Sequence, residues 1–368
     1  MSQTRPPAYI VMPLVALVAV VLAASAFALV DRGSDALVGE SASSRAEASA
    51  RAAASDDAAG STRPALRPPA ALVQMRTQSW GVTIPRVPGE LTRLNELERI
   101  TGRAPDRVMW YASWSDFRDF PTQLARRVAR RGALPEISWE PWDPARGVDQ
   151  PAYAMDRIAA GGEDRYLRRW ARQARAYREP VVIRFAHAMN GDWYPWGVGR
   201  RGVTARDHKA AWRHVVGIFR EEGAHNVLWS WSPNVPFPGS VPIEDLYPGD
   251  AWVDRVALDG YNWAGYRPGT TWMPFTQVAS EGLEQLAEVS SRPAYMGEVA
   301  APEKGGDKAR WVRGMFAYAE SDARLRGLTW FDFRKRADWR IDSSRASARA
   351  FRQGLRGYGA EGSLVTGS

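Results

Sequence analysis

The sequence predicts an α/β fold, a (β/α)₈ TIM barrel in a single domain. Three observations lead to this prediction. Short apolar stretches alternate with amphipathic stretches of helical period, eight such apolar stretches follow one another, and the residues directly after them are aromatic and polar. Alternation of strands and helices indicates βαβ units and a parallel sheet, and eight repeats indicate closure into a barrel.

Residues 1–31 are expected to lie outside this fold. Arg5 precedes an almost uninterrupted apolar run from Ala8 to Val30, and about 20 apolar residues suffice to cross a bilayer. The run also contains small-x-small sites of the kind that signal peptidase cleaves, such as Ala24-Ser25-Ala26. We therefore expect a signal peptide or an N-terminal transmembrane anchor, with the rest of the chain extracellular or on the cell surface.

Residues 32–72 are rich in Ala, Ser, Pro and Arg and contain few large apolar side chains. Such a segment buries too little apolar surface to offset the entropy lost on ordering, so a disordered linker is expected. The barrel is then expected to span residues 73–358, and residues 359–368 to form a flexible tail.

The barrel region contains apolar stretches of strand length separated by helical patterns. The expected strands are Trp80–Ile84, Arg107–Tyr111, Glu136–Trp139, Val181–Phe185, Val227–Trp231, Arg255–Leu258, Ala294–Met296 and Leu328–Phe331. The expected helices are Leu91–Ile100, Thr122–Arg130, Arg165–Tyr177, Ala205–Glu222, Phe275–Val289, Lys308–Glu320 and Arg345–Leu355. The connection Ser232–Trp252 is expected to be mostly irregular. A doubly wound open sheet is the alternative, but no glycine-rich phosphate loop follows any strand.

Composition limits the chemistry and the partners. The chain has no cysteine, which excludes disulfides and thiolate metal sites. Its four histidines are scattered without ligand spacing, so we expect no metal and no cofactor. The net charge of +8 comes from basic residues interleaved with acids. This pattern argues against nucleic acid and favours an anionic envelope or an acidic polysaccharide nearby. We expect a monomer.

Aromatic residues follow most of the expected strands. In a parallel barrel all these strand ends lie on one face, where active sites are found. Many of the 17 tryptophans fall at these positions rather than in helices. An indole face suits the C–H groups of a sugar ring, while its N–H remains free for hydroxyl groups. A sugar-stacking surface is therefore expected at this face, although Trp80, Trp170 and Trp212 are expected to pack in the core.

The segment Arg184-Phe185-Ala186-His187-Ala188-Met189-Asn190-Gly191-Asp192-Trp193-Tyr194-Pro195-Trp196 resembles the strand-four signature of glycoside hydrolase family 26. In that family the residue after the histidine is the acid/base glutamate, and here that position is Ala188. The segment Tyr295-Met296-Gly297-Glu298-Val299 resembles the family's nucleophile segment. The resemblance implies that Glu298 is the nucleophile, with Tyr261 and Arg184 as hydrogen-bond donors that keep it ionised.

Further matching segments extend the resemblance from Trp80 to about Trp339. The two catalytic positions that it implies are Glu298 and Ala188. The substrate-binding residues that it implies are Arg184, His187, Asn190, Trp193, Trp196, Tyr261, Trp263, Trp330, Trp139 and Glu140. Of these, Asn190 is equally compatible with a role in orienting loops, and Glu140 with a structural salt bridge.

Ala188 leaves three explanations open. One is that Ala188 is an engineered substitution in an otherwise intact active enzyme. Another is that the chain is a natural protein that binds glycan without cutting it. Alternatively, another carboxylate such as Asp192 or Glu140 has taken over proton transfer.

The resemblance implies a retaining endo-β-glycosidase of the β-mannanase type, impaired by Ala188, with a β-linked polysaccharide or oligosaccharide as partner. The membrane is involved only through the N-terminal segment. Alternatives are a non-catalytic glycan-binding protein of the cell envelope, and a hydrolase of β-1,3:1,4-glucan or of an exopolysaccharide.

Overall fold

The computed structural model describes residues 78–85, 91–199 and 202–359 of the chain. The expected signal or anchor segment and linker lie outside the described residues, as do the first residues of the expected barrel and nearly all of the tail. Among the residues that are described, no helix has the length and apolar character needed to cross a membrane.

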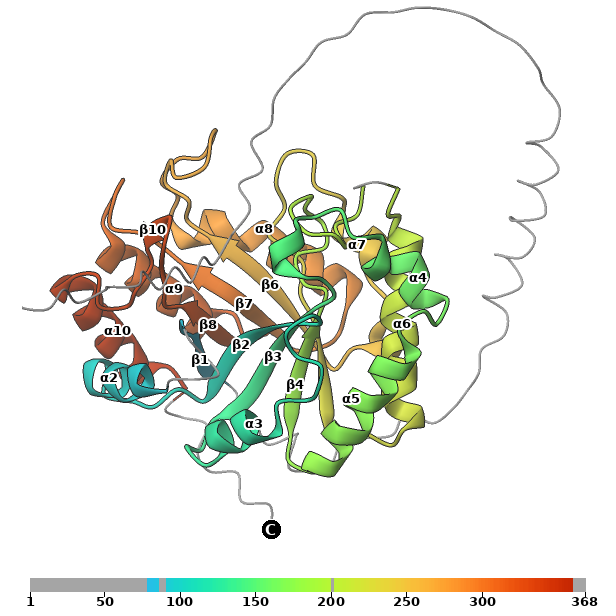
Figure 1. Cartoon of the computed structure of the whole chain (residues 1–368). Helices are drawn as coiled ribbons and strands as arrows, with labels where there is room; N and C mark the ends of the chain where they lie inside the picture. The colour runs from blue at the N-terminus through green and yellow to red at the C-terminus, as the bar shows by residue number, and fades with distance from the viewer. Residues whose placement is uncertain (1–77, 86–90, 200–201, 360–368) are drawn as a thin grey trace, which may run out of the picture. The chain divides into compact units, whose positions relative to one another are not determined.

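The described residues form a closed barrel of eight parallel strands surrounded by helices (Figure 1). Each strand pairs with the next, and β8 closes the barrel against β1, where Val82 pairs with Trp330. The strands are β1 (Ser79–Thr83), β2 (Arg107–Ser113), β3 (Leu134–Glu140), β4 (Val181–Phe185), β5 (Val227–Trp231), β6 (Arg255–Tyr261), β7 (Ala294–Ala300) and β8 (Leu325–Phe331). The expected (β/α)₈ TIM barrel is confirmed.

Helices connect successive strands, mostly at the expected places. They are α2 (Thr92–Thr101), α3 (Thr122–Ala129), α4 (Met155–Ala159), α5 (Asp164–Tyr177), α6 (Ala205–Glu221), α7 (Ile243–Leu246), α8 (Phe275–Val289), α9 (Lys308–Ser321) and α10 (Arg345–Gly357). Of these, α4 and α7 were not expected from the sequence. Helix α6 begins where Thr204 and Asp207 satisfy each other's backbone N–H groups in a capping box. The irregular connection between β5 and β6 contains only α7 and one turn of 3₁₀ helix at Asp250–Trp252.

Four strands, β2, β3, β6 and β7, are longer at their C-terminal ends than the sequence suggested, and β6 and β7 show the largest extensions. Strand β6 continues to Tyr261 and β7 to Ala300, so each includes a carboxylate, Asp259 or Glu298. The apolar pattern ends before these residues, but the backbone pairing of β6 with β7 continues and places Asp259 beside Glu298. Both carboxylates are buried inside the barrel.

A short hairpin follows β8 and lies near the site described below. It consists of β9 (Arg334–Lys335) and β10 (Ala337–Asp338), and Arg336 connects them with φ of 60°. The Nε1 of Trp339 donates to the backbone oxygen of Lys335 at 2.8 Å, which fixes the base of the hairpin.

Candidate active site

The C-terminal ends of β4, β6 and β7 bring together one arginine and two carboxylates. Arg184 is fully buried on β4, and its Nη1 donates to Asp259 Oδ1 at 2.6 Å. Its Nη2 forms an ion pair with Glu298, and it also donates to Ser138 Oγ at 3.1 Å. The guanidinium therefore holds the two carboxylates at fixed positions inside the barrel mouth.

Glu298 is held as an ionised carboxylate. Burial by itself raises its pKa, but Arg184, His187 and the hydroxyls of Tyr261 and Tyr111 outweigh this effect and lower the pKa to about 2. The Tyr261 hydroxyl donates to one oxygen of Glu298, and Arg184 donates to the other. The expected hydrogen bonds from Tyr261 and Arg184 are therefore present.

His187 lies between two carboxylates directly after β4. Its Nε2 is 3.1 Å from Glu140 Oε1, and its Nδ1 is 3.2 Å from Asp259 Oδ2 and 3.9 Å from Glu298 Oε1. Burial and the charge of Arg184 lower the pKa of the imidazole. The hydrogen bonds to Asp259 and Glu140 raise it by more, so the net shift of the pKa is upward. These surroundings favour the protonated, cationic form of the imidazole, which connects Glu140 of β3 with Asp259 of β6.

Ala188 occupies the turn that follows β4. Its φ is 50°, and that of Ala186 is 44°, both in the left-handed region that residues with a Cβ rarely adopt. The N–H of Ala188 donates to Ser232 O at 2.7 Å, and its own oxygen accepts from Gly191 N at 3.1 Å. Such backbone strain is concentrated at functional sites in proteins. Ala188 therefore lies after the C-terminal end of β4, at the same end of the barrel as Glu298 of β7.

Asn190 connects two loops through both ends of its amide. Its Nδ2 donates to Asn234 O at 2.8 Å, and its Oδ1 accepts from Asn234 N at 2.8 Å. Of the two roles open for Asn190, this geometry favours the orientation of loops.

The predicted aromatic residues divide into two groups. Trp193, Trp263 and Tyr261 are half-buried in the loops and strand ends at the mouth, as is Tyr194, which was not predicted. Trp196 is fully buried beneath Tyr194, with ring centroids 4.3 Å apart, and its Nε1 donates to His187 O at 2.7 Å. Trp196 therefore supports the loop from below.

For Trp139 and Trp330 the structure corrects the sequence prediction of substrate contact. Trp139 stacks on Trp170 of α5 at 4.6 Å, and Trp330 packs on Phe351 of α10 at 4.6 Å. Both rings are buried between strands and helices. Successive side chains of a strand alternate between faces, so the neighbours of Trp139, Ser138 and Glu140, point inward instead.

Three site residues were not identified as such from the sequence. Asp259 lies on β6 between Arg184 and His187, and Tyr111 and Tyr194 lie close to the same carboxylates. The signal for Asp259 was present, because an acid directly after the apolar run Val256–Leu258 stands at the end of a parallel strand.

Three potential metal ligands lie close together at this site. Within the described parts of the chain, His187, Asp259 and Glu298 place one ligand atom each within 4.8 Å of one another. The Arg184 guanidinium already donates to both carboxylates and neutralises part of their charge.

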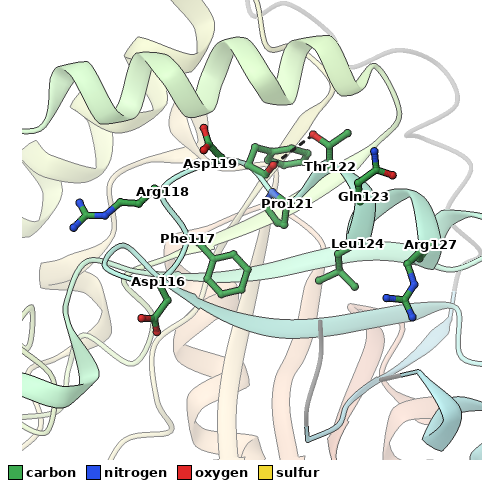
Figure 2. Close-up of a pocket in the computed structure, with 10 residues that line it drawn as sticks. Asp116, Phe117, Arg118, Asp119, Pro121, Thr122, Gln123, Leu124 and Arg127 are labelled. Atoms are coloured by element: carbon green, nitrogen blue, oxygen red, sulfur yellow. Dashed lines mark hydrogen bonds between the residues drawn. The ribbon is translucent and has the colours of Figure 1, made fainter. Parts of the chain in front are cut away.

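A hollow of about 560 Å³ lies away from this site, on the connection between β2 and α3 (Figure 2). Asp119, at its edge, is paired with Arg169 of α5 at 2.6 Å, and Gln173 bonds both Asp119 and the N–H of Phe120. These polar groups join α5 to the loop and offer no reactive constellation.

Part of the chain is similar to one known family. Residues 128–302 match the family model of glycosyl hydrolase family 26. Endoglucanase H of Acetivibrio thermocellus is 34% identical over 267 residues, which is 71% of this chain and 29% of that protein. A mannan endo-1,4-beta-mannosidase of Bifidobacterium adolescentis is 35% identical over 85 residues, 23% of this chain and 8% of its own length. The chain thus spans less than a third of the length of these relatives.

Solved structures show the same fold. The catalytic domain of a GH26 endo-beta-1,4-mannanase from Bacillus sp. JAMB-750 has a TM-score of 0.57 at 20% identity, covering 76% of this chain and 85% of that one. A modular endo-beta-1,4-mannanase from Cellulomonas fimi has a TM-score of 0.59 at 19% identity, covering 78% and 72%.

Proposed function

We propose that this chain, whose residues 128–302 carry a glycosyl hydrolase family 26 domain, is a retaining endo-β-glycanase that is catalytically impaired by Ala188. The observation that carries the proposal is the buried, ionised Glu298, held by Arg184 and Tyr261 on the face where the aromatic loops converge. In this proposal Glu298 is the nucleophile and position 188 is the acid/base position.

The chemistry is a double displacement. Glu298 attacks the anomeric carbon while an acid protonates the leaving oxygen, and water activated by the same group then releases the sugar with retention. Arg184 and Tyr261 keep Glu298 deprotonated, and its low pKa makes it unsuited to donate a proton. The proton transfer therefore falls to the opposite position, where Ala188 carries no ionisable group.

The surroundings of Glu140 and Asp192 do not favour either carboxylate as the proton donor in place of residue 188. One oxygen of Glu140 lies 3.1 Å from His187 Nε2, and the other accepts from Trp142 Nε1 at 3.1 Å. Asp192 is exposed to solvent in the following loop.

The second candidate function is glycan binding without cleavage, and Ala188 itself is the observation that favours it. Removing a group that acts on the leaving oxygen leaves stacking and hydroxyl contacts in place. In either case the substrate class is a β-linked polysaccharide, with β-1,4-mannan or β-1,3:1,4-glucan suggested by the names of the relatives and by the family. The apolar run at residues 8–30 supports export of the domain.

The deciding experiment measures hydrolysis and binding of β-1,4-mannan, lichenan and β-1,3-xylan oligosaccharides. Ala188→Glu is expected to raise hydrolysis by roughly 10²–10⁴, the usual contribution of general acid catalysis. Ala188→Gln is the matched control, because it has a similar shape without an ionisable proton. Binding by both forms with hydrolysis by neither would favour the non-catalytic function, and no binding to any β-glycan would contradict both.

A further inference from the structure

Three basic side chains lie around the aromatic part of the barrel mouth. The guanidinium carbon of Arg267 is 3.7 Å from the centroid of the Trp263 ring and 5.3 Å from that of Trp193. Arg267 thus stands between the loop that follows β4 and the loop that follows β6. A guanidinium stacked on a ring keeps its edge N–H groups free to bind a planar anion.

The hairpin after β8 carries Lys335 and Arg336, and it is joined through Trp339 to Tyr261 and Trp263 at the mouth. Trp339, which binds the hairpin backbone at Lys335, packs on Tyr261 at 5.6 Å and on Trp263 at 5.5 Å. Tyr261 in turn donates to Glu298. A continuous set of contacts therefore connects the hairpin to the proposed nucleophile.

Arg336 occupies a costly backbone position. Its φ of 60° is in the left-handed region, where glycine carries no steric penalty and an arginine does. Lys335 and Arg336 are both exposed, and Arg267 is half-buried. Burial and the charge of Arg336 both lower the pKa of Arg267, so the two cations repel each other where they stand.

These three cations form no ion pair with any of the residues that the structure describes. Elsewhere on the surface, basic residues such as Arg324 and Arg340 pair with aspartates. The carboxylates that face the trio are Asp192, near Arg267, and Glu140 and Glu298, near Lys335. Glu298 is already paired with Arg184, and Glu140 is bonded to His187. Even with Asp192 counted against them, the three cations outnumber the carboxylates that remain, so positive charge is left at the mouth.

Resting on the proposed function, we infer that Arg267, Lys335 and Arg336 bind the carboxylates of an acidic β-glycan that contains uronic acid units. A neutral glycan would desolvate these cations without neutralising them, which costs free energy. A uronate carboxylate instead accepts charge-assisted hydrogen bonds from a guanidinium edge while its sugar ring lies against the aromatic loops. Among β-glycans, the site is therefore expected to prefer an anionic polysaccharide over neutral mannan or glucan.

The test compares two hexasaccharides that differ only at C6, β-1,4-oligomannuronate and β-1,4-oligomannose, by calorimetry with the full chain. Mannuronate is expected to bind about tenfold tighter at low salt, because three ion pairs at the surface contribute modestly each. This preference is expected to shrink as salt is added.

Single substitutions assign the preference to the three residues. Arg267→Gln, Lys335→Gln and Arg336→Gln should each weaken mannuronate binding severalfold and leave mannose binding nearly unchanged. Arg99→Gln, an exposed site in the last turn of α2, is the control for net charge. Equal binding of both sugars, or an equal loss in Arg99→Gln, would overturn this inference alone. Failure of both sugars to bind would overturn the proposed glycan site as well.

Discussion

At the scale of single residues, Glu298 and Ala188 differ in what they offer to the expected chemistry. Glu298 receives donors on both oxygens, whereas Ala188 offers only a methyl group, in a left-handed turn. Arg184 and His187 both contact Asp259 beside Glu298, and these contacts form without a carboxylate at position 188.

The role of Glu298 is tested with an aryl β-glycoside whose phenol is acidic. This leaving group needs no protonation, so Glu298 should form the glycosyl-enzyme, which then waits for a base to activate water. Azide needs no base, and its addition should speed turnover and give a β-glycosyl azide, since two inversions give retention. Product analysis by NMR checks this. Glu298→Ala should abolish the reaction, and an α-azide would identify a different nucleophile.

The low pKa of Glu298 also predicts a dependence of stability on pH. Because its pKa is about 2 in the folded protein and near 4.5 when unperturbed, the carboxylate stabilises the fold above pH 4.5. This contribution, on the order of a few kcal/mol, is lost as the pH falls from 4.5 towards 2.

Urea unfolding of wild type and Glu298→Gln at pH 7 and pH 3.5 measures this effect. The difference in unfolding free energy between the two should be smaller at pH 3.5. Asp338→Asn, at a partly exposed pair with Arg340, is the control. A difference that does not change with pH would show that Arg184 and Tyr261 do not hold Glu298 ionised.

At the scale of elements, the turn between β4 and α6 determines where the site can form. Two alanines of this turn have positive φ, and a hydrogen bond from Ala188 to Ser232 joins it to the end of β5. The sequence predicted the strand bounds Val181–Phe185 correctly. The turn conformation was not predictable, because alanine gives no local signal for a left-handed backbone.

The strain in this turn predicts an unusual response to glycine. Ala188→Gly removes the steric cost of Cβ at positive φ, about 1 kcal/mol, which offsets the entropy that glycine adds to the unfolded chain. The unfolding free energy should therefore be unchanged or slightly higher. Ala112→Gly, at a buried site within β2, should cost about 1 kcal/mol. Equal losses at both positions would contradict the left-handed turn.

At the scale of the whole molecule, a second buried charge network lies between the barrel strands. Glu136 of β3 lies 3.4 Å from Arg107 Nε of β2 and forms a further ion pair with Arg255 of β6. Both arginines also stack on Tyr295 of β7, at 5.0 and 4.5 Å. One carboxylate therefore connects strands on opposite sides of the barrel interior.

Glu136→Gln is expected to destabilise the protein by about 3–5 kcal/mol, because it leaves two buried guanidinium groups without an anion. Thermal and urea unfolding measure the loss. Asp322→Asn, at an ion pair with the exposed Arg324, is the control and should cost less than about 1 kcal/mol. A small effect of Glu136→Gln would mean that the two arginines are neutralised in another way.

The sequence alone determined the fold class, the order of the strands and helices, and the segments that carry the site. Period-two and helical patterns are local properties, and in a parallel barrel they fix which ends of the strands meet. The family resemblance also marked Glu298, Arg184, His187 and Tyr261.

Only the tertiary structure decided which of these residues touch. It placed Asp259 between Arg184 and His187, joined Asn190 to the neighbouring loop, and turned Trp139 and Trp330 towards the helices. It also set three cations beside the aromatic mouth. The contacts of Asp259 and Asn190 join residues 44 or more positions apart, and whether a strand-end tryptophan faces sugar or core depends on one residue of register.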